Sequence, residues 1–445
     1  MTTKDDLISK LENKTAKIGI LGMGYVGMPL AVVFAEKGFN VYGIDPDQRK
    51  VDTFNKGISY IQDVPSETVA RLQKAGKLQM TADFAALAEM DAVSICVPTP
   101  LRQTGDPDMS FILSATEELA KYVHKGMVVV LESTTYPGTT REILVPMLAD
   151  NNKQKLKVGE DIFICFSPER VDPGREDWTT YNTPKVMGGM TPACVEVATK
   201  WYAGALETLV PVSSPEAAEM AKLLENTFRM INIGMVNELA MMCERLGVDV
   251  WEVIDAAASK PFGFMKFTPG PGLGGHCIPI DPLYLSWKMK ALNYNAKFIE
   301  LASEINTNMP RYVVSRILEG LNDRGKTLKG NNVLVLGVAY KPDIDDVRES
   351  PALDVIALLR KKGANVKFHD PYIPLIHHEH EHWKMESISD ADLLSEVRKA
   401  DVVVLVTNHK TYKYPELIKN AQFIFDTRNA TGKFVSPETT NVERL

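Results

Sequence analysis

Residues 17–45, KIGILGMGYVGMPLAVVFAEKGFNVYGID, decide the fold into which the rest of the chain must fit. A short apolar run leads into three glycines spaced as Gly22, Gly24 and Gly27, a helical pattern follows, and a second apolar run ends at Asp45. This order of strand, glycine turn, helix and strand, with an acid about 20 residues beyond the glycines, is typical of a dinucleotide-binding unit. We therefore predict an α/β fold that opens with a parallel, doubly wound sheet.

Each residue of this fingerprint has a physical task in binding a dinucleotide. Gly22 permits the tight turn, Gly24 lets the backbone approach the pyrophosphate, and Gly27 lets the helix pack closely on the strand. The start of the helix offers free N–H groups to the phosphates. Asp45 would bind the adenosine ribose and repel a 2′-phosphate, so we expect NAD rather than NADP.

Further apolar runs alternate with helical patterns and extend the predicted sheet. They are Ala92–Val97, Met127–Leu131 and Ile162–Phe166. Ligands of such sheets bind beyond the carboxyl ends of the strands. Hydroxyl groups and an acid–base pair follow these runs, in Pro98-Thr99-Pro100, Glu132-Ser133-Thr134-Thr135 and Ser167-Pro168-Glu169-Arg170. They suit a substrate crevice, although turn and cap chemistry would explain each of them taken singly.

The pattern changes at Ser214, where a long helix is predicted to begin. Ser214 suits the N-cap and Pro215 the first turn, and an apolar stripe then runs without a breaker to about Gly247. Three polar residues share one face of this helix because they lie four and three positions apart, namely Lys222, Asn226 and Arg229. On a helix that stands alone such residues are usually solvated.

A second helical stretch is predicted from about Leu283 to Leu321, with Pro310 as a kink or break. The two stretches would form a helical middle part of the chain. Their methionine-rich apolar faces favour a subunit interface, so we expect a homodimer or a higher homo-oligomer.

Between the two helical stretches lies a constrained loop, Phe267–Tyr284, with the sequence FTPGPGLGGHCIPIDPLY. Its glycines allow close approach of the backbone and its prolines fix the turns. Cys277, with Asp281 four residues later, is a candidate nucleophile, because a reactive thiolate needs a polar, partly open site. The alternative is a small buried thiol in a structural loop, which is the commoner state of a free cysteine.

The last third of the chain repeats the opening pattern without its phosphate fingerprint. Apolar runs at 332–337 and 365–370 flank a helical pattern over about Pro351–Lys362, and Val338-Ala339-Tyr340-Lys341-Pro342 stands where the glycines would be. We therefore expect this unit to bind part of the substrate rather than a second dinucleotide. The runs Val402–Val406 and Phe423–Phe425 would complete its sheet. The predicted domains are 1–212 for NAD, 213–325 for the helices and catalytic loop, and 326–445 for the substrate nucleotide.

Composition excludes several classes of function. The 445 residues carry a formal net charge of −7 without a basic block, so nucleic acid is not an expected partner. No stretch reaches the roughly 18 apolar residues of a membrane span, and the charged N-terminus is not that of a signal peptide. The five cysteines lie far apart, which favours a reducing cytoplasm over a disulfide framework. The run from His377 to His382 could bind metal by composition, but we expect a solvated loop and no metal site.

A hydride acceptor combined with a nucleophilic cysteine indicates an oxidation that continues past the aldehyde, through a thiohemiacetal and a thioester. With this chemistry in view, the chain resembles the UDP-glucose/GDP-mannose dehydrogenase family over nearly its whole length. The matching stretches are GMGYVG (22–27), STT (133–135), SPER (167–170), AKLLEN (221–226), GPGLGGHCIPIDP (270–282) and AYKPDIDDVRES (339–350). The resemblance implies two NAD per turnover, oxidation of a C6 alcohol to a carboxylate, and a dimer formed through helices.

The resemblance also implies roles for residues of this sequence. Cys277 would be the nucleophile, and Lys222 and Asp281 would stabilise oxyanions and orient the hydrolytic water. Thr134 and Glu169 would lie at the reacting carbon, with Glu169 as a base in thioester hydrolysis. The implied catalytic residues are Cys277, Lys222, Asp281, Glu169, Thr134 and Asn226. The expected cofactor-binding residues are Gly22, Gly24, Tyr25, Val26, Gly27, Asp45, Lys50, Thr99, Thr134 and Arg348. The expected substrate-binding residues are Arg170, Val171, Lys222, Asn226, Arg229, Gly274 and Lys341.

Within the family, the stretches HCIPIDP (276–282) and FSPERVDPG (166–174) resemble the branch that acts on UDP-N-acetylhexosamines. KPFGF at 260–264 resembles the UDP-N-acetylglucosamine 6-dehydrogenases, and UDP-N-acetylmannosamine and UDP-glucose are the alternative substrates. The product would feed the synthesis of a surface polysaccharide or glycan. Two other classes stay open from the residues alone. One is a two-electron hydroxy-acid or sugar-acid dehydrogenase, and the other is a non-catalytic NAD-binding regulator with an inert thiol.

Overall fold

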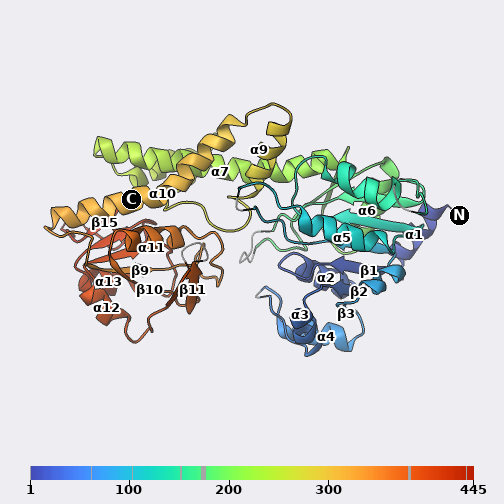
Figure 1. Cartoon of the computed structure of the whole chain (residues 1–445), viewed down its shortest axis with the longest axis horizontal. Coiled ribbons are helices and arrows are strands. Elements are labelled where there is room, and N and C mark those ends of the chain that lie inside the picture. The colour runs from blue at the N-terminus through green and yellow to red at the C-terminus, as the bar shows by residue number, and fades with distance from the viewer. Residues whose placement is uncertain are drawn as a thin grey trace. The chain divides into compact units, whose positions relative to one another are not determined.

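The computed structural model describes residues 2–61, 63–102, 104–150, 153–171, 177–378, 382–436 and 438–445. The chain divides into two compact units (Figure 1). The first comprises the residues up to Glu225 together with Leu283–Asn293, and the second comprises Asn226–Pro282 and Tyr294–Leu445. Two helices, α7 (Pro215–Leu246) and α9 (Asp281–Ala291), therefore give residues to both units. The three-domain division made from the sequence stays a prediction.

The first unit is built on a large, mostly parallel sheet. Its described strands are β1 (Lys17–Leu21), β2 (Asn40–Ile44), β3 (Leu78–Thr81), β4 (Ala92–Ile95), β5 (Met127–Leu131), β6 (Ile162–Phe166), β7 (Lys185–Gly189) and β8 (Leu209–Val212). They lie in the order β3-β2-β1-β4-β5-β6-β7-β8. The order reverses at β1, between β2 and β4, which is the arrangement of a dinucleotide-binding sheet.

Helices cover both faces of this sheet. They are α1 (Thr3–Glu12), α2 (Gly27–Glu36), α3 (Gln48–Asn55), α4 (Ser66–Lys74), α5 (Ser110–Ala120) and α6 (Pro192–Ala203), with the shorter helical segments η1 (Phe84–Glu89), η2 (Thr140–Leu144) and η3 (Pro146–Asp150). Successive residues of β5 point to opposite faces, as the pleat requires. Val128 and Val130 join a core with α2 and α6, whereas Val129 and Leu131 join a second core with α5. The predicted doubly wound α/β fold is thus confirmed.

One strand of the first sheet runs against its neighbour. β7 pairs with β6 antiparallel, whereas β5 pairs with β6 and β7 pairs with β8 in parallel. The start of β7 therefore lies at the edge of the sheet where β5 and β6 end. No sequence pattern predicted this reversal, and it brings a charged residue, Lys185, to the edge where ligands bind.

The second unit contains a smaller parallel sheet of the same kind. The order of its described strands is β10 (Asn365–His369), β9 (Asn332–Leu336), β13 (Val402–Leu405), β14 (Ile424–Asp426) and β15 (Val442–Arg444). A separate hairpin joins β11 (Leu375–His378) to β12 (Trp383–Glu386). Helices α11 (Pro351–Lys361), α12 (Leu393–Lys399) and α13 (Tyr414–Asn420) accompany the sheet. Val402 and Val404 join one core and Val403 and Leu405 the other, so the second Rossmann-like unit is also confirmed.

The helical part between the two sheets agrees with the sequence in its first helix and differs in its second. The side chain of Ser214 accepts a hydrogen bond from the amide of Ala217 (3.2 Å), so the predicted N-cap of α7 is confirmed. α8 (Val250–Ala258) follows. The break in the second stretch lies at residues 292–296, between α9 and α10 (Lys297–Asp323), and not at Pro310, through which α10 continues. Of the helices that the structure describes, none is both long and apolar enough to cross a membrane.

The histidine run is only partly described. His377 and His378 end strand β11, and the ring of His378 stacks on that of Trp383 with their centroids 5.0 Å apart. Glu379, His380 and Glu381 lie outside the described residues, as do Asp172, Pro173 and Gly174 of the FSPERVDPG stretch.

Candidate active site

The glycine fingerprint forms the turn between β1 and α2. Gly22 has φ +95°, and a Cβ atom there would lie 2.6 Å from the carbonyl oxygen of Cys96. A Cβ atom on Gly27 would lie 1.9 Å from the carbonyl oxygen of Gly22, so this contact between helix and turn needs glycine. A Cβ atom on Gly24 would meet nothing within 4 Å. This open backbone beside the start of α2 fits a bound pyrophosphate.

The acid at the end of β2 is in place beside this turn. The buried carboxylate of Asp45 accepts hydrogen bonds from the amides of Met23 (3.0 Å) and Asp47 (3.0 Å) and pairs with Lys50 at 2.8 Å. The structure thus brings Asp45 and Lys50 together with the fingerprint. Val26 lies at the N-cap of α2, and Tyr25 beside it is exposed. These residues fit the predicted NAD site.

We expect Asp45→Ala to raise the KM for NAD about tenfold or more, because hydrogen bonds to a charged group are the strong ones. The KM for NADP should rise less, because the repulsion of the 2′-phosphate is lost as well. Steady-state kinetics with both cofactors measure the two effects. Asp52→Ala, an exposed change on the neighbouring helix α3, should leave both constants unchanged. Unchanged constants in Asp45→Ala would contradict the ribose-binding role.

The hydroxyl groups that follow β5 differ in whether they form hydrogen bonds within the protein. Ser133 donates to the carbonyl oxygen of Val97 (2.8 Å), and Thr135 shares a hydrogen bond with Thr139 (2.5 Å). The half-buried hydroxyl of Thr134 has no hydrogen-bond partner among the residues that the structure describes. Of these neighbouring hydroxyl groups, that of Thr134 is therefore the one available to a ligand. Thr99, after β4, is also half-buried.

Glu169 and Arg170 follow β6, and Arg170 connects this end of the strand to α7. Glu169 accepts hydrogen bonds from the amides of Arg170 and Val171, each at 2.8 Å. The guanidinium of Arg170 binds the carboxylate of Glu225 on α7 at 2.6 Å and the carbonyl oxygen of Pro184, also at 2.6 Å. The carboxyl end of β6 thus lies against the turn of α7 that carries Lys222, three residues before Glu225.

Lys222 is the least expected side chain of this turn, because it is a lysine that is only 8% exposed. Within the described ranges its ammonium group has neither an ion pair nor a hydrogen bond. A buried cation without a partner is costly, so such a group is typical of a site that awaits an anion. The solvated state that is usual for such residues on a helix standing alone does not hold for Lys222. It does not hold for Asn226 either, which is buried one helical turn later, whereas Arg229 is exposed. The predicted roles of these residues stay predictions.

The cysteine loop belongs to the second unit, and there it is tied to Asn226. The Asn226 amide donates to the carboxylate of Asp281 at 2.6 Å, and both side chains are buried. The amide of Asp281 donates to the carbonyl oxygen of Cys277 at 2.8 Å, which closes a turn between them. Cys277 is half-buried, whereas Cys96, Cys165, Cys194 and Cys243 are buried. The thiol in the loop is thus the accessible one, as a nucleophile requires.

A buried chain of amides holds the start of this loop. The amide of Gly270 donates to the side chain of Asn237 (2.9 Å), which donates to Asn306 (2.8 Å), which in turn donates to the carbonyl oxygen of Met230 (3.1 Å). A backbone N–H at one end and a backbone carbonyl at the other fix the orientation of both amides. The loop is therefore anchored to α7 and α10 by hydrogen bonds between buried side chains.

The other end of the glycine run lies against the segment after β9. A Cβ atom on Gly274 would lie 2.7 Å from the side chain of Tyr340, so only glycine fits there. The amide of Gly275 donates to the carbonyl oxygen of Arg348 at 3.1 Å. The exposed guanidinium of Arg348 is paired with Asp346 at 2.6 Å, and Lys341 is half-buried. Gly274, Lys341 and Arg348 thus come together in one part of the second unit.

Asp370, at the end of β10, occupies the position that Asp45 has in the first unit, but its carboxylate is already saturated. It accepts hydrogen bonds from the amides of Val338 (2.6 Å), Ala339 (3.0 Å), Tyr372 (2.9 Å) and Ile373 (3.1 Å). It also accepts one from the imidazole of His409 (3.0 Å). These five hydrogen bonds occupy the lone pairs of the carboxylate, whereas that of Asp45 accepts three from described residues.

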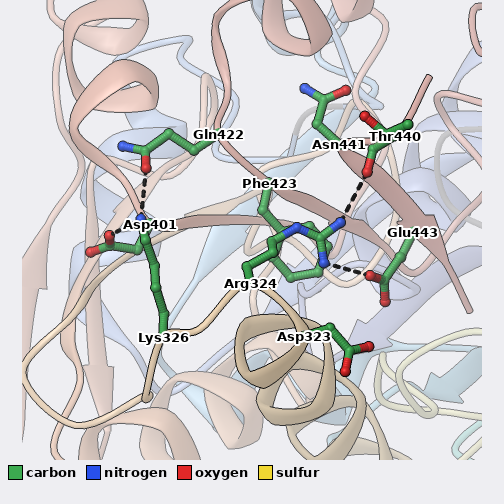
Figure 2. Close-up of a pocket in the computed structure, with 9 residues that line it drawn as sticks. All are labelled: Asp323, Arg324, Lys326, Asp401, Gln422, Phe423, Thr440, Asn441 and Glu443. Carbon is green, nitrogen blue, oxygen red and sulfur yellow. Dashed lines mark hydrogen bonds and ion pairs between the residues drawn. The ribbon is translucent and has the colours of Figure 1, made fainter. Parts of the chain in front are cut away.

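A hollow of about 590 Å³ in the second unit is lined by none of these residues (Figure 2). Asp401 and Phe423 line it, just before β13 and β14, so it opens at the amino ends of parallel strands, opposite to where such sheets bind ligands. Figure 2 shows its cations already paired. Arg324 binds Glu443 at 2.7 Å, and Lys326 binds Asp401 at 2.6 Å. We therefore do not place the active site there.

Sequence reasoning missed the groups that support these residues. Glu132 was noted only as part of a strand end, and Lys185 and Asn237 were not noted at all. A lysine at the start of the apolar run KVMGG was the available signal for Lys185. Asn237 lies within an apolar helical stripe, where a single amide gives no signal of what it contacts.

Three family models match this chain. All belong to the UDP-glucose/GDP-mannose dehydrogenase family and describe its NAD binding domain (residues 16–206), its central domain (216–308) and its UDP binding domain (334–433). A UDP-N-acetyl-D-mannosamine dehydrogenase of Methanococcus maripaludis is 33% identical over 93% of this chain and 92% of its own length. A UDP-N-acetyl-D-glucosamine 6-dehydrogenase of Pseudomonas aeruginosa is 35% identical over 81% of this chain and 84% of its own. The solved structure of the UDP-D-ManNAc dehydrogenase from Pyrococcus horikoshii superposes with a TM-score of 0.85 at 30% identity, over 96% of this chain and 98% of that one.

Proposed function

This chain belongs to the UDP-glucose/GDP-mannose dehydrogenase family, and we propose that it oxidises the C6 hydroxymethyl group of a UDP-N-acetylhexosamine to a carboxylate. As a member of this family it is an NAD-dependent dehydrogenase of nucleotide sugars. One observation carries the proposal of a four-electron reaction. Cys277 is the accessible cysteine of the chain, in a turn closed onto a buried acid, Asp281, that Asn226 holds.

The covalent step takes place on Cys277. When bound, NAD would accept one hydride from the alcohol carbon and, in a second molecule, one from the thiohemiacetal carbon. The thiolate of Cys277 adds to the aldehyde carbon and forms a C–S bond, and the carbonyl oxygen takes up the negative charge. Loss of hydride leaves a thioester on Cys277, and water then breaks the C–S bond to give the carboxylate and the free thiol. The sum is an alcohol, two NAD⁺ and water converted into a carboxylate, two NADH and three protons.

The remaining residues handle charge and protons. We propose that the ammonium group of Lys222, which is buried and has no anion beside it among the described residues, stabilises the oxyanions formed on the carbonyl carbon. Asp281, oriented by Asn226, would orient the hydrolytic water. Glu169 would take a proton from that water, and the half-buried hydroxyl group of Thr134 would donate a hydrogen bond at the reacting carbon. Arg170, Val171, Arg229, Gly274 and Lys341 are proposed substrate contacts, and Thr99 and Arg348 proposed cofactor contacts.

The sugar is proposed from the stretches HCIPIDP and KPFGF. They resemble the branch for N-acetylhexosamines and, within it, the enzymes for UDP-N-acetylglucosamine, which we take as the substrate. UDP-N-acetylmannosamine is the second candidate, because a relative of similar identity carries that name. The two sugars are epimers at C2, and a small change of shape gives only a few kcal/mol of discrimination. We propose that the product feeds the synthesis of a surface polysaccharide or glycan.

The ratio of NADH formed to sugar nucleotide consumed tests this function. UDP-N-acetylglucosamine, UDP-N-acetylmannosamine and UDP-glucose would be offered separately, with NADH followed by absorbance and the acid by chromatography. Two NADH per UDP-N-acetylglucosamine, with little turnover of the other two sugars, is the expected result. Two NADH from a different sugar would keep the mechanism and overturn the substrate. One NADH per sugar would overturn the thioester route.

We propose that the chain is a homodimer or a higher homo-oligomer through α7. Apolar side chains at a repeating spacing of four and seven residues are exposed along this helix, namely Leu224, Phe228, Met235, Met242 and Leu246. Such a stripe is typical of a helix that packs against another. Sedimentation velocity of the full chain is expected to give at least twice the monomer mass. A monomer at micromolar concentration would contradict this proposal.

We also propose that the protein works in the cytoplasm, because its five cysteines are free thiols. Fractionation of cells should recover the chain with cytoplasmic markers. Recovery with secreted proteins would contradict this.

A further inference from the structure

A lysine and two glutamates lie together at the carboxyl edge of the first sheet. The ammonium group of Lys185 lies 2.5 Å from a carboxylate oxygen of Glu132 and 3.1 Å from one of Glu169. Lys185 is 3% exposed and Glu132 is 1% exposed, whereas Glu169 keeps partial access. A buried lysine thus connects an inaccessible carboxylate to the one that is proposed as the hydrolytic base.

The reversed strand accounts for this arrangement. Glu132 follows β5 and Glu169 follows β6, and these two strands are parallel. Lys185 begins β7, which runs against β6, so its side chain comes to the same edge. The hydroxyl of Ser167 donates to the carbonyl oxygen of Val186 (2.8 Å), which keeps the two segments together beyond the sheet. A parallel β7 would have placed Lys185 at the opposite edge.

Glu132 is fixed in turn by neutral groups. The hydroxyl of Tyr202, on α6, donates to its second carboxylate oxygen at 2.5 Å and lies 2.7 Å from the hydroxyl of Ser94 on β4. Both residues are fully buried. Glu132 therefore has no freedom to turn toward a substrate, and it serves as the anchor of Lys185.

The charges of the cluster act on Glu169 in a definite direction. Burial by itself would raise the pKa of Glu169, but Lys185 and the amides of Val171 and Arg170 outweigh it and hold that pKa below its usual value. Burial raises the pKa of Glu132 more than Lys185 lowers it, and the negative Glu169 adds to the rise. Burial lowers the pKa of Lys185, but the two carboxylates outweigh this and leave it above the usual value, so Lys185 is a cation. Among the described residues, Arg170 is a further charged neighbour, and it is paired with Glu225.

We propose that Lys185 is a positioning residue for thioester hydrolysis, which keeps the carboxylate of Glu169 ionised and holds it in one orientation. Lys185 does not touch the substrate in this proposal. It acts through Glu169, so the inference rests on the role of Glu169 in the proposed function. Glu132 carries the second contact of Lys185 and prevents the ammonium group from turning away. If Lys185 only stabilised the fold, its removal would lower stability but would not change the pH dependence of thioester hydrolysis.

The test compares Lys185→Met and Lys185→Arg with the wild-type chain. The rate of thioester hydrolysis is measured across pH in single turnovers, as the acid formed after the second NADH has appeared, so that thiolate formation and product release do not enter. In Lys185→Met we expect the acid limb of the hydrolysis rate to move to higher pH by about one unit or more, a loss of about tenfold below the limb. The direction follows because removal of the cation raises the pKa of Glu169, and a base must be unprotonated. Lys185→Arg keeps the charge and should restore most of the wild-type profile.

In a second variant, Glu132→Gln, the acid limb of the hydrolysis rate is not expected to move to higher pH. Glu132→Gln removes the negative charge but keeps a side-chain oxygen that can accept a hydrogen bond from Lys185. Lys185 then stays in place with Glu169 as its one anion among the described residues, and the acid limb should stay or move to lower pH. A shift to higher pH in Glu132→Gln would overturn the proposal. So would an equal loss at every pH in Lys185→Met without rescue by Lys185→Arg. Lys157→Met, which removes an exposed partner of Glu160, is the matched control and should leave the profile unchanged.

A measurement without turnover separates this inference from the function itself. The infrared band of a protonated carboxyl group, assigned to Glu169 by its loss in Glu169→Gln, reports the ionisation directly. As the pH is lowered, we expect this band to appear at a higher pH in Lys185→Met than in the wild-type chain. An unchanged titration of the band in a folded Lys185→Met chain would overturn the role of Lys185 and leave the function standing. If thermal unfolding shows that Lys185→Met does not fold, the pH profiles of Glu132→Gln and Lys185→Arg test the proposal instead. The expected directions of their acid limbs are those stated above. One NADH per sugar would overturn the function, while the infrared result still tests Lys185.

Discussion

Cys277→Ser is expected to bind NAD as the wild-type chain does but to release no carboxylate, with a loss of at least about a thousandfold in acid formation. A serine hydroxyl ionises far less readily than a thiol, so the adduct with the aldehyde does not accumulate and the second hydride is not transferred. The thiol is the right group to test because it alone of the five cysteines is half-buried. Acid is measured by chromatography, and NAD binding by fluorescence quenching or calorimetry.

The control for this change is Cys243→Ala, which alters a buried thiol on α7 in the same unit. It should lower stability somewhat and leave two NADH per sugar. Full conversion to the carboxylate by Cys277→Ser would sink the covalent mechanism. Loss of NAD binding in Cys277→Ser would show that the change disturbs more than the nucleophile.

Lys222→Met should lower the rate of the chemical step about a hundredfold to a thousandfold and, at the same time, stabilise the chain without ligands. The first effect follows because removal of one oxyanion-stabilising group costs about that factor. The second follows because the ammonium group is 8% exposed and no described residue pairs with it. Replacing such a cation by an apolar side chain of similar length should add on the order of 1 kcal/mol to the free energy of unfolding.

Single-turnover kinetics and urea unfolding of the same preparations measure the two effects. Lys74→Met, an exposed lysine on α4, is the matched control and should change neither quantity. A loss of stability in Lys222→Met would indicate that Lys222 has a structural partner. An unchanged rate with increased stability would contradict the oxyanion role.

Much of the fold could be predicted from the sequence because the signals are local. The apolar runs at Lys17–Gly22 and Met127–Leu131 become β1 and β5 almost residue for residue, since a buried parallel strand needs a continuous apolar run. Pro310 was predicted as a kink or a break, and the structure contradicts the break. Proline disfavours a helix interior locally, yet α10 continues through it, with Pro310 buried among the helix residues that face the second core.

The candidate site divides in the same way. Some residues, such as Cys277 and Asp45, are proposed to react or bind through their own side chains. They stand out from the sequence because they lie only a few residues from the glycines or acids of their motifs. The groups that hold them in place did not stand out. Asn237 and Asn306 are 69 positions apart, and Glu132 and Lys185 are 53 apart. No periodicity connects such pairs.

The sequence by itself determined the two Rossmann-like units, the NAD fingerprint with its acid, the long helix α7 and the loop that carries Cys277. These features follow from hydrophobic periodicity and turn chemistry, which act between residues close together in the chain. The tertiary structure alone decided that β7 reverses and brings Lys185 to Glu169, and that Lys222 is buried without a partner among the described residues. It also decided that the carboxylate of Asp370 accepts five hydrogen bonds from described residues where that of Asp45 accepts three. Those outcomes depend on which groups, distant in the sequence, meet in the buried interior. There the dielectric constant is low, so the neighbouring groups decide whether a charge is stabilised or destabilised.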